Sequence, residues 1–152
     1  MSMKRQLLVA ALENGTVIDH IPCDKVFQVI NLLHLDQNDH DAITIGLNLE
    51  SERIGLKGII KVANRFFTDE ELNQLSVITP NVSLAIIRGY EVVEKKDVCM
   101  PPTLSGIICC PNPKCICNNE PMRTLFHAVP GTDHLTCHYC GTTVRQRDVS
   151  LC

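Results

Sequence analysis

Residues 59–93, which read IIKVANRFFTDEELNQLSVITPNVSLAIIRGYEVV, decide the fold, because a strand, a helix and a second strand follow one another there. Ile59–Val62 is a short β-branched run, which is typical of a strand. The TDEE sequence at residues 68–71 is a capping box, in which the threonine and the second glutamate satisfy the first helical N–H groups. A helix is therefore predicted to begin there and to end before Pro80.

Leu72 and Leu75 share one face of this helix, and Ile78 is a further candidate for it. After the helix, Val82–Ile87 and Tyr90–Val93 are apolar, strand-length segments. They are predicted to close the sheet.

Upstream, strands are predicted at Gln6–Leu12 and Ala42–Leu49, and Gly55 and Gly58 are predicted to flank a turn. Pro22 suits the first turn of a helix, whose apolar spacing is carried by Val26, Phe27, Ile30 and Leu33. The predicted order is β-α-β-β-α-β. This is an α+β, ferredoxin-like sandwich in which an antiparallel sheet carries both helices on one face.

The composition changes after residue 98. Eight of the nine cysteines lie beyond it, and Pro101-Pro102 interrupts both helix and strand, so two domains are predicted, at residues 1–98 and 103–152. The second has short β segments near residues 107–108, 125–129 and 142–144, which predict a small all-β domain of the zinc-ribbon or rubredoxin type. A chain of about 50 residues buries too little core to fold unaided, so it needs a cross-link or a metal.

Charge and composition exclude several classes of function. The net charge is −3, the pI is about 6.0 and aromatic residues make up 4%. These values argue against a nucleic-acid or anionic-membrane binder. The N-terminal MSMKRQLLVAALENG has no signal-peptide core, so a cytoplasmic protein is expected.

Two thiol pairs point to a metal. Cys110 and Cys115 form C-x₄-C, and Cys137 and Cys140 form C-x₂-C followed by Gly141. Four thiolates suit one tetrahedral Zn²⁺ with no open position, which is a structural site. Two alternatives for the first pair of ligands stay open: Cys109 could replace Cys110, and Cys117 could replace Cys115. His127, His134 and His138 are interpreted as surface residues, and Cys23, Cys99 and Cys152 as cysteines without a ligand role.

The first domain contains no phosphate-loop or dinucleotide motif. Asp19-His20 interrupts an apolar segment, and Lys57, Lys61 and Lys95 lie in or beside predicted strands. An aspartate accepts hydrogen bonds from ribose hydroxyls and lysines neutralise phosphates. The alternative is that Asp19-His20 is a polar pair that ends a strand and that the three lysines lie on a solvated face.

The chain resembles, over its whole length and in order, the regulatory chains of aspartate carbamoyltransferase. The resemblance rests on GTVIDHIP at 15–22, ITIGLNL at 43–49, IIK at 59–61, YEVV at 90–93 and the two thiol pairs. It implies an N-terminal allosteric domain that binds nucleotides and a C-terminal zinc domain that docks on the catalytic chain.

The resemblance also implies a set of nucleotide-binding residues: Val9, Ala11, Leu12, Val17, Asp19, His20, Lys57, Ile59, Lys61, Ile87, Tyr90, Val92 and Lys95. Backbone groups near Leu12 and Tyr90 would read the base. Asp19 and Lys61 would hold the ribose and a nearby base oxygen. Lys95, with His20 and Lys57, would meet the triphosphate.

The implied function is non-catalytic, in de novo pyrimidine biosynthesis: inhibition by CTP or UTP, activation by ATP, and regulatory dimers that bridge two catalytic trimers. Ala10 and Ala85 depart from the family, where Glu and Asn are usual, so they bear on nucleotide preference. The loop between the thiol pairs is short, which bears on assembly with a foreign catalytic chain.

Three rival functions follow from the same residues. A zinc-ribbon nucleic-acid module would need a basic face, whereas residues 99–152 carry four Lys/Arg and three Asp/Glu. Electron transfer would need iron at the thiols. An acylphosphatase-like enzyme would need a phosphate-cradling loop with an arginine, which the sequence lacks.

Overall fold

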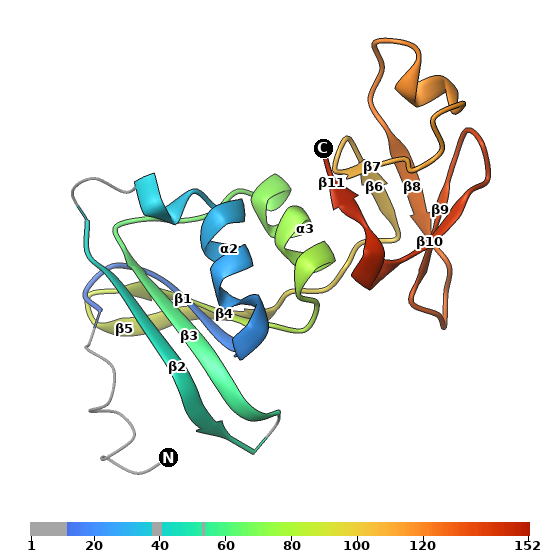
Figure 1. Cartoon of the computed structure of the whole chain (residues 1–152). Helices are drawn as coiled ribbons and strands as arrows, with labels where there is room; N and C mark the ends of the chain where they lie inside the picture. Colours follow the sequence, from blue (N-terminus) through green and yellow to red (C-terminus); the bar gives the residue numbers. More distant parts are fainter. Residues whose placement is uncertain (1–11, 38–40, 53) are drawn as a thin grey trace.

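The computed structural model describes residues 12–37, 41–52 and 54–152, and folds them into two parts that lie side by side (Figure 1). The larger part is an antiparallel sheet with two helices, and the smaller part consists of short strands. The predicted α+β class and the small all-β C-terminal part are confirmed. Within the described residues, no helix combines the length and the apolar character needed to cross a bilayer.

The elements follow in chain order. The larger part contains β1 (Gly15–Pro22), the 3-10 turn η1 (Cys23–Lys25), α2 (Val26–Leu32), η2 (Leu35–Gln37), β2 (Ile43–Ser51), β3 (Gly55–Ala63), α3 (Asp69–Ile78), β4 (Ser83–Arg88) and β5 (Glu91–Asp97). The smaller part contains β6 (Thr103–Ser105), β7 (Ile108–Cys109), η3 (Ile116–Asn118), β8 (Leu125–Ala128), β9 (His134–Cys137), β10 (Thr143–Arg145), η4 (Gln146–Asp148) and β11 (Ser150–Leu151).

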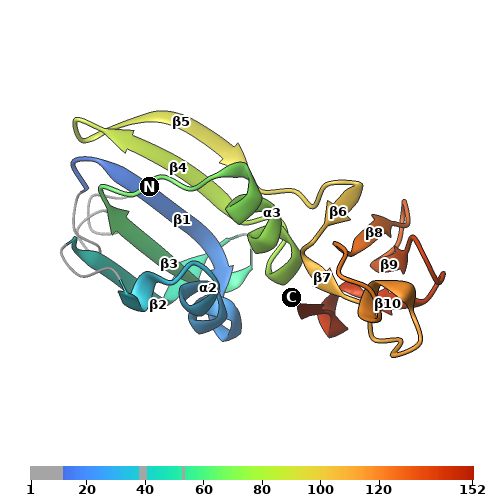
Figure 2. The same cartoon turned by 90° about the horizontal axis from the view of Figure 1, so that it is seen from above.

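The large sheet has the order β2-β3-β1-β4-β5, and every neighbouring pair is antiparallel. The first four positions match the ferredoxin-like arrangement, and β5 is added beside β4. Both views show α2 and α3 over the same face of this sheet (Figures 1 and 2).

Strand alternation separates the two faces of the sheet. Ile18, Ile60 and Leu84 occupy registered positions on β1, β3 and β4, and all three are at most 2% exposed. They pack with residues of α2 and α3 in one buried cluster. Since successive side chains of a strand point to opposite faces, Val17 and its registered neighbours lie on the face without helices.

Local sequence explains the position of the helices. The Thr68 side chain accepts from the Glu71 N–H, and the Glu71 carboxylate accepts from the Thr68 N–H, which confirms the predicted capping box. Gly58 allows α2 to approach the sheet, because a Cβ there would collide with Val26 Cγ2. Gly58 lies inside β3, so the prediction that it borders a turn is wrong.

Other predicted elements need correction. The predicted strand at residues 6–12 lies outside the described residues except for Leu12, which is not in a strand. Within the described residues the first strand is β1, for which no strand was predicted, and the strand at residues 6–12 stays a prediction. Phe27 is 61% exposed, and the buried face of α2 is formed by Val26 and Val29.

The smaller part contains a four-stranded sheet, β10-β9-β8-β6, and a two-stranded sheet, β11-β7. Its core contains Leu104, Ile108, Phe126 and Leu135, each at most 1% exposed. Val77 of α3 belongs to this second cluster and not to the core of its own sheet. Helix α3 therefore contributes to the packing of both parts.

Candidate functional site

Four cysteine thiols converge in the smaller part. Cys110 follows β7, Cys115 precedes η3, Cys137 ends β9, and Cys140 lies in the turn between β9 and β10. Their Sγ atoms all lie within 4.8 Å of one another. The Sγ atoms of Cys110 and Cys140 are 3.6 Å apart, and those of Cys115 and Cys137 are 3.7 Å apart.

These distances fit one tetrahedral zinc ion. A Zn–S bond of about 2.3 Å in a regular tetrahedron gives S···S separations of about 3.8 Å. Three of the four cysteines are buried, and four thiolates fill the coordination shell. The cluster is therefore consistent with structural zinc, with no position left for a substrate.

The four thiols differ in acidity. Burial raises the pKa of Cys110 well above its ordinary value. By contrast, hydrogen bonds from the Thr142 side chain and backbone lower the pKa of the exposed Cys140 to about 6. The Thr142 hydroxyl lies 3.0 Å from Cys140 Sγ and forms a hydrogen bond with it. A metal must therefore displace the proton from Cys110, whereas the lowered pKa of Cys140 favours its thiolate.

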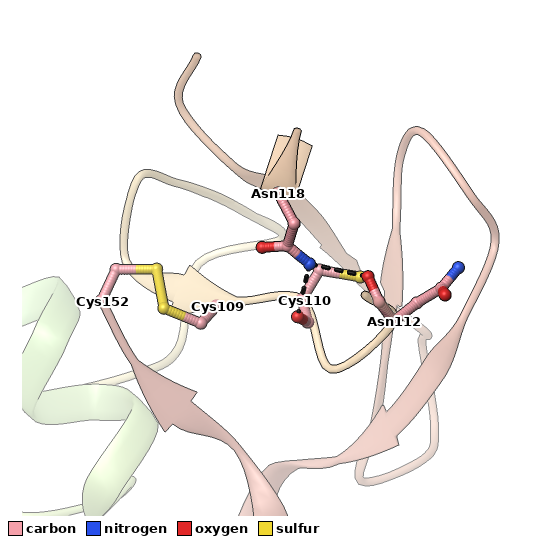
Figure 3. Close-up of a disulfide and its surroundings, with 5 residues drawn as sticks. All are labelled: Cys109, Cys110, Asn112, Asn118 and Cys152. Carbon is pink, nitrogen blue, oxygen red and sulfur yellow. Dashed lines mark hydrogen bonds between the residues drawn. A yellow bond between two sulfur atoms is a disulfide. The ribbon is translucent and has the colours of Figure 1, made fainter. Parts of the chain in front are cut away.

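Two asparagines, which the sequence analysis did not single out, fix the first thiol pair. The Asn118 side-chain amide donates to the carbonyls of Cys110 (2.9 Å) and Asn112 (2.7 Å), as Figure 3 shows. The Asn119 amide donates to the carbonyl of Cys115 at 2.8 Å. These bonds hold the backbone at both thiols of the pair.

The register alternatives are resolved by the neighbouring cysteines. Cys109 forms a disulfide with Cys152, so neither belongs to the cluster, which agrees with the interpretation of Cys152 as a cysteine without a ligand role (Figure 3). Cys117 Sγ lies 3.2 Å from Cys115 Sγ, outside the four-thiol set, and burial raises its pKa to about 11. Cys23 and Cys99 are free thiols.

The three histidines lie outside the four-thiol cluster. His127 Nε2 and His138 Nδ1 are 2.9 Å apart, and His134 lies beside Asp133. Gly141 has a φ of +77°, the left-handed conformation that the second thiol turn requires.

Those of the other candidate residues that the structure describes lie on or beside the helix-free face of the large sheet, here called the open face. One registered row crosses all five strands: Thr44, Lys61, Val17, Ala85 and Lys95. Ile59 and Lys57 follow on the same face of β3, and Ile87 and Val92 form the adjacent pair of β4 and β5. Two lysines thus flank the apolar centre of the row.

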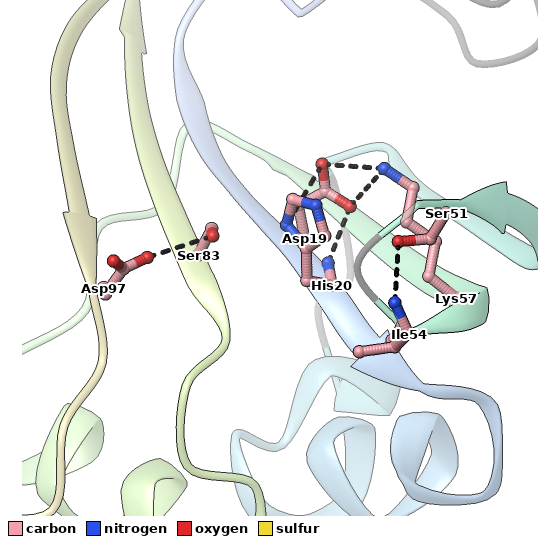
Figure 4. A network of polar contacts seen from close by, with 7 residues as sticks. All are labelled: Asp19, His20, Ser51, Ile54, Lys57, Ser83 and Asp97. Atoms are coloured by element: carbon pink, nitrogen blue, oxygen red, sulfur yellow. Dashed lines mark hydrogen bonds and ion pairs between the residues drawn. The ribbon is translucent and has the colours of Figure 1, made fainter.

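A polar group lies farther along β1. The Lys57 ammonium is 2.9 Å from Asp19 Oδ1 and 3.1 Å from Oδ2, and the His20 N–H donates to Asp19 Oδ1 at 2.6 Å (Figure 4). His20 has a φ of +61°, and its buried Nδ1 has no hydrogen-bond partner. Beyond Asp19, the Ser83 hydroxyl donates to Asp97 on β5.

Lys61 lies at mid-sheet. Burial lowers the pKa of its ammonium, and the nearby charge of Asp19 opposes that effect only in part. A negatively charged ligand on the open face would favour the protonated form.

The opposite end of the open face is formed by the β4–β5 hairpin. Gly89 and Tyr90 both have positive φ, at +59° and +65°, as a two-residue hairpin turn requires. The Tyr90 N–H donates to the Glu13 carbonyl at 2.9 Å, so the hairpin is tied to the segment that includes Leu12. Val9, Ala10 and Ala11 lie outside the described residues.

Comparison with known proteins gives the same two-part division of the sequence. The family model of the aspartate carbamoyltransferase regulatory chain, allosteric domain, matches residues 7–99. The model of the metal binding domain of the same chain matches residues 102–150.

Individual relatives agree along nearly the full length. An aspartate carbamoyltransferase regulatory chain of Phocaeicola vulgatus is 64% identical over 97% of this chain and 96% of its own. One of Bacteroides fragilis is 54% identical over 97% of both chains, and one of the archaeon Pyrococcus abyssi is 39% identical over 95% of this chain and 96% of its own. The chain therefore belongs to the family of aspartate carbamoyltransferase regulatory chains, and it is a non-catalytic chain with an allosteric domain and a metal-binding domain.

Proposed function

We propose that this regulatory chain binds CTP or UTP as feedback inhibitors and ATP as an activator on the open face of its sheet. Residues 1–98 would form the nucleotide-binding unit and residues 103–152 the unit that docks on the catalytic chain. In this proposal the protein acts in the cytoplasm, in de novo pyrimidine biosynthesis. The observation that carries the nucleotide site is the row in which Lys61 and Lys95 flank Val17 and Ala85 on the open face.

Apart from Lys95, which lies in the same row as Lys61, the order of groups along β1 matches the order of groups in a nucleotide. The hairpin at Tyr90 and the segment at Leu12 lie at one end and would meet the base. Lys61 and Asp19 would meet the ribose and a nearby base oxygen. Gly15 to Asp19 spans about 13 Å at about 3.3 Å per residue, which suits an extended nucleotide.

The phosphate end is supplied by cations. Lys57 is held by Asp19 at 2.9 Å, so it is already positioned before a ligand arrives. A triphosphate would compete with Asp19 for this ammonium and would also attract Lys95 and His20. Ala85, at the centre of the row, adds no polar group, so base selectivity would depend mainly on the backbone groups near Leu12 and Tyr90.

Regulation would follow from linkage. Each nucleotide shifts the equilibrium between the low-activity and high-activity arrangements of the holoenzyme. The size of this shift is limited by the difference in the affinity of the nucleotide for the two arrangements. Two catalytic trimers bridged by three regulatory dimers would transmit this difference through the metal-binding part. Chelation of the metal should then abolish assembly before it abolishes nucleotide binding, because the open face contains none of the four thiols.

Self-association is supported by the edges of the sheet. Within the described residues, β2 forms one edge and exposes Ile45 and Leu47, which are 42% and 39% exposed. At the other edge, β5 carries the charged run Glu94–Asp97, which discourages strand addition. A dimer joined at β2 should be dissociated by Ile45→Lys, as measured by sedimentation velocity.

Calorimetric titration of the metal-loaded chain with CTP, followed by competition with ATP, tests the nucleotide proposal. Lys95→Ala should weaken CTP binding on the order of tenfold, because a charge-assisted contact to phosphate is lost. Lys96→Ala is the matched control, since the next residue of the same strand points to the opposite face. Absence of CTP binding in a folded, metal-loaded chain, or equal losses in both variants, would contradict the proposal.

A further inference from the structure

Two cysteines outside the metal cluster are joined to each other. Cys109 in β7 and Cys152, which follows β11, form a disulfide whose Cα atoms are 5.1 Å apart across 43 residues of sequence (Figure 3). Cys109 immediately precedes the cluster residue Cys110. The cross-link therefore connects the segment after β10 to the strand that leads into the metal centre.

Few other interactions hold this segment to β7. The β7–β11 ladder pairs only Ser150 with Cys109 and Leu151 with Ile108, and the Cys152 N–H donates to the Ile107 carbonyl at 2.9 Å. A two-stranded ladder of this length is marginal in water. Val149 and Leu151 also pack against the core of the smaller part, and the disulfide adds a covalent constraint to these contacts.

The same segment also contacts the helices of the larger part. The Gln146 side-chain amide donates to the Val77 carbonyl of α3. A cleft of about 400 Å³ separates the two parts; its walls include Lys25, Asn31 and Ile78 on one side and Arg147, Val149 and Leu151 on the other. Fixing β11 therefore fixes one wall of the cleft between the two parts.

We propose that Cys109 and Cys152 are a reversible thiol-modification site, a redox clasp that closes when the chain meets an oxidising low-molecular-weight disulfide. Closed, the clasp holds β11 on β7 and holds the segment from Gln146 to Leu151 against α3. Open, it releases β11 and loosens the contact between the two parts. This inference goes beyond the proposed nucleotide function and does not depend on it.

The chemistry is thiol–disulfide exchange. The thiolate of Cys152, which is exposed, attacks the small disulfide RSSR, forms a mixed disulfide and releases one RS⁻. The thiolate of Cys109, which is half-buried, then attacks the Cys152 sulfur and releases the second RS⁻. Two protein thiols lose two electrons, RSSR gains them, and the two thiol protons leave on two RSH. The four cluster thiols would be engaged by the metal, and of the remaining cysteines Cys109 and Cys152 are the pair that the structure joins, whereas Cys23, Cys99 and Cys117 are free.

Hydrogen-exchange mass spectrometry of the full, metal-loaded chain tests the clasp in mixtures of reduced and oxidised glutathione. In oxidising mixtures a cross-linked peptide pair containing Cys109 and Cys152 should form, and amides of residues 149–152 should exchange on the order of tenfold more slowly than in reducing mixtures. Cys152→Ser should show fast exchange in both mixtures. Cys99→Ser, which removes a free thiol outside the clasp, should behave like the wild type.

Metal content is measured in every sample, because loss of metal would also loosen the smaller part. Failure to form the Cys109–Cys152 link at any glutathione ratio would overturn the proposal. So would a link that forms without slowing exchange in residues 149–152. If Cys152→Ser failed to fold, the oxidised and reduced wild-type chains would still decide between these outcomes.

Discussion

The ammonium of Lys57 on β3 lies 2.9 Å from the carboxylate of Asp19 on β1, and this pair fixes one end of the open face. The Lys57 side chain is 16% exposed and that of Asp19 is 26% exposed, so solvent screens the pair only partly. The same carboxylate accepts from the His20 N–H, which helps to hold His20 at its positive φ. A single aspartate thus organises both of the neighbouring side chains that are proposed to meet phosphate.

Replacing Lys57 by Gln should weaken triphosphate binding more than nucleoside binding. The variant removes a cation proposed to meet phosphate but leaves the hairpin and the middle of the open face unchanged. CTP affinity should fall on the order of tenfold, while cytidine affinity should change by less than about twofold. Calorimetry with both ligands measures the difference, with Lys96→Gln as the control on the opposite face. Equal losses for CTP and cytidine would instead indicate a general distortion of β3.

Proton uptake should accompany nucleotide binding at alkaline pH. Burial lowers the pKa of Lys61 in the free chain, and a bound triphosphate should raise it again. Between these two pKa values the complex holds a proton that the free chain lacks, so affinity should fall as the pH rises through that window. Calorimetry in buffers of different ionisation enthalpy counts the protons, and Lys61→Met should abolish the uptake.

The same pKa shift has a consequence for folding. The unfolded chain retains the ordinary Lys pKa of 10.5, whereas the folded chain loses the Lys61 proton at lower pH. Between the two values the unfolded chain binds more protons, so the Lys61 contribution to stability should increase as the pH rises. A Lys61→Met chain that kept this pH dependence would show that another group is responsible.

The parts of the fold that sequence could predict are those with strong local signals. The capping box at Thr68 defined the start of α3, and the two thiol pairs identified the metal centre, because each signal lies within a few residues. By contrast, β1 was missed because Asp19-His20 interrupts its apolar pattern and its pairing with β3 shifts register between Ile18 and Ile21. Phe27 fitted the helical spacing but is exposed. The spacing could not show this, because tertiary packing decides which face of a short helix is buried.

The remaining misses depend on contacts between distant residues. Strands of two to four residues, such as β6 and β11, are too short to show a period. The Cys109–Cys152 pairing spans 43 residues and carries no local motif. Asn118 and Asn119 fix the thiol turns through side-chain bonds to backbone carbonyls, which a spacing of residue types does not reveal.

Thr142→Val should accelerate metal loss. The Thr142 hydroxyl lies 3.0 Å from Cys140 Sγ, and it is the main reason that the pKa of Cys140 falls from 9.0 to about 6. Without this hydrogen bond the pKa of Cys140 rises, protons compete better for the thiolate, and half-release of the metal should move to higher pH. Metal affinity, measured by competition with a chromophoric chelator, should fall about 10- to 100-fold. Thr143→Val is the neighbouring control, because its hydroxyl faces Thr136 instead; equal effects of both variants would contradict the role of Thr142.

Gly58→Ala should destabilise the larger part because of one steric contact. A Cβ at residue 58 would collide with Val26 Cγ2, so α2 must move away from β3. Overpacking of this kind costs about 1–3 kcal/mol in the free energy of unfolding. Adding Val26→Ala removes the obstructing methyl groups, so the double variant should lose less stability than the sum of the single variants. Urea unfolding of the four chains gives the coupling energy. A coupling near zero would show that the cost at residue 58 arises from the backbone and not from the approach of α2.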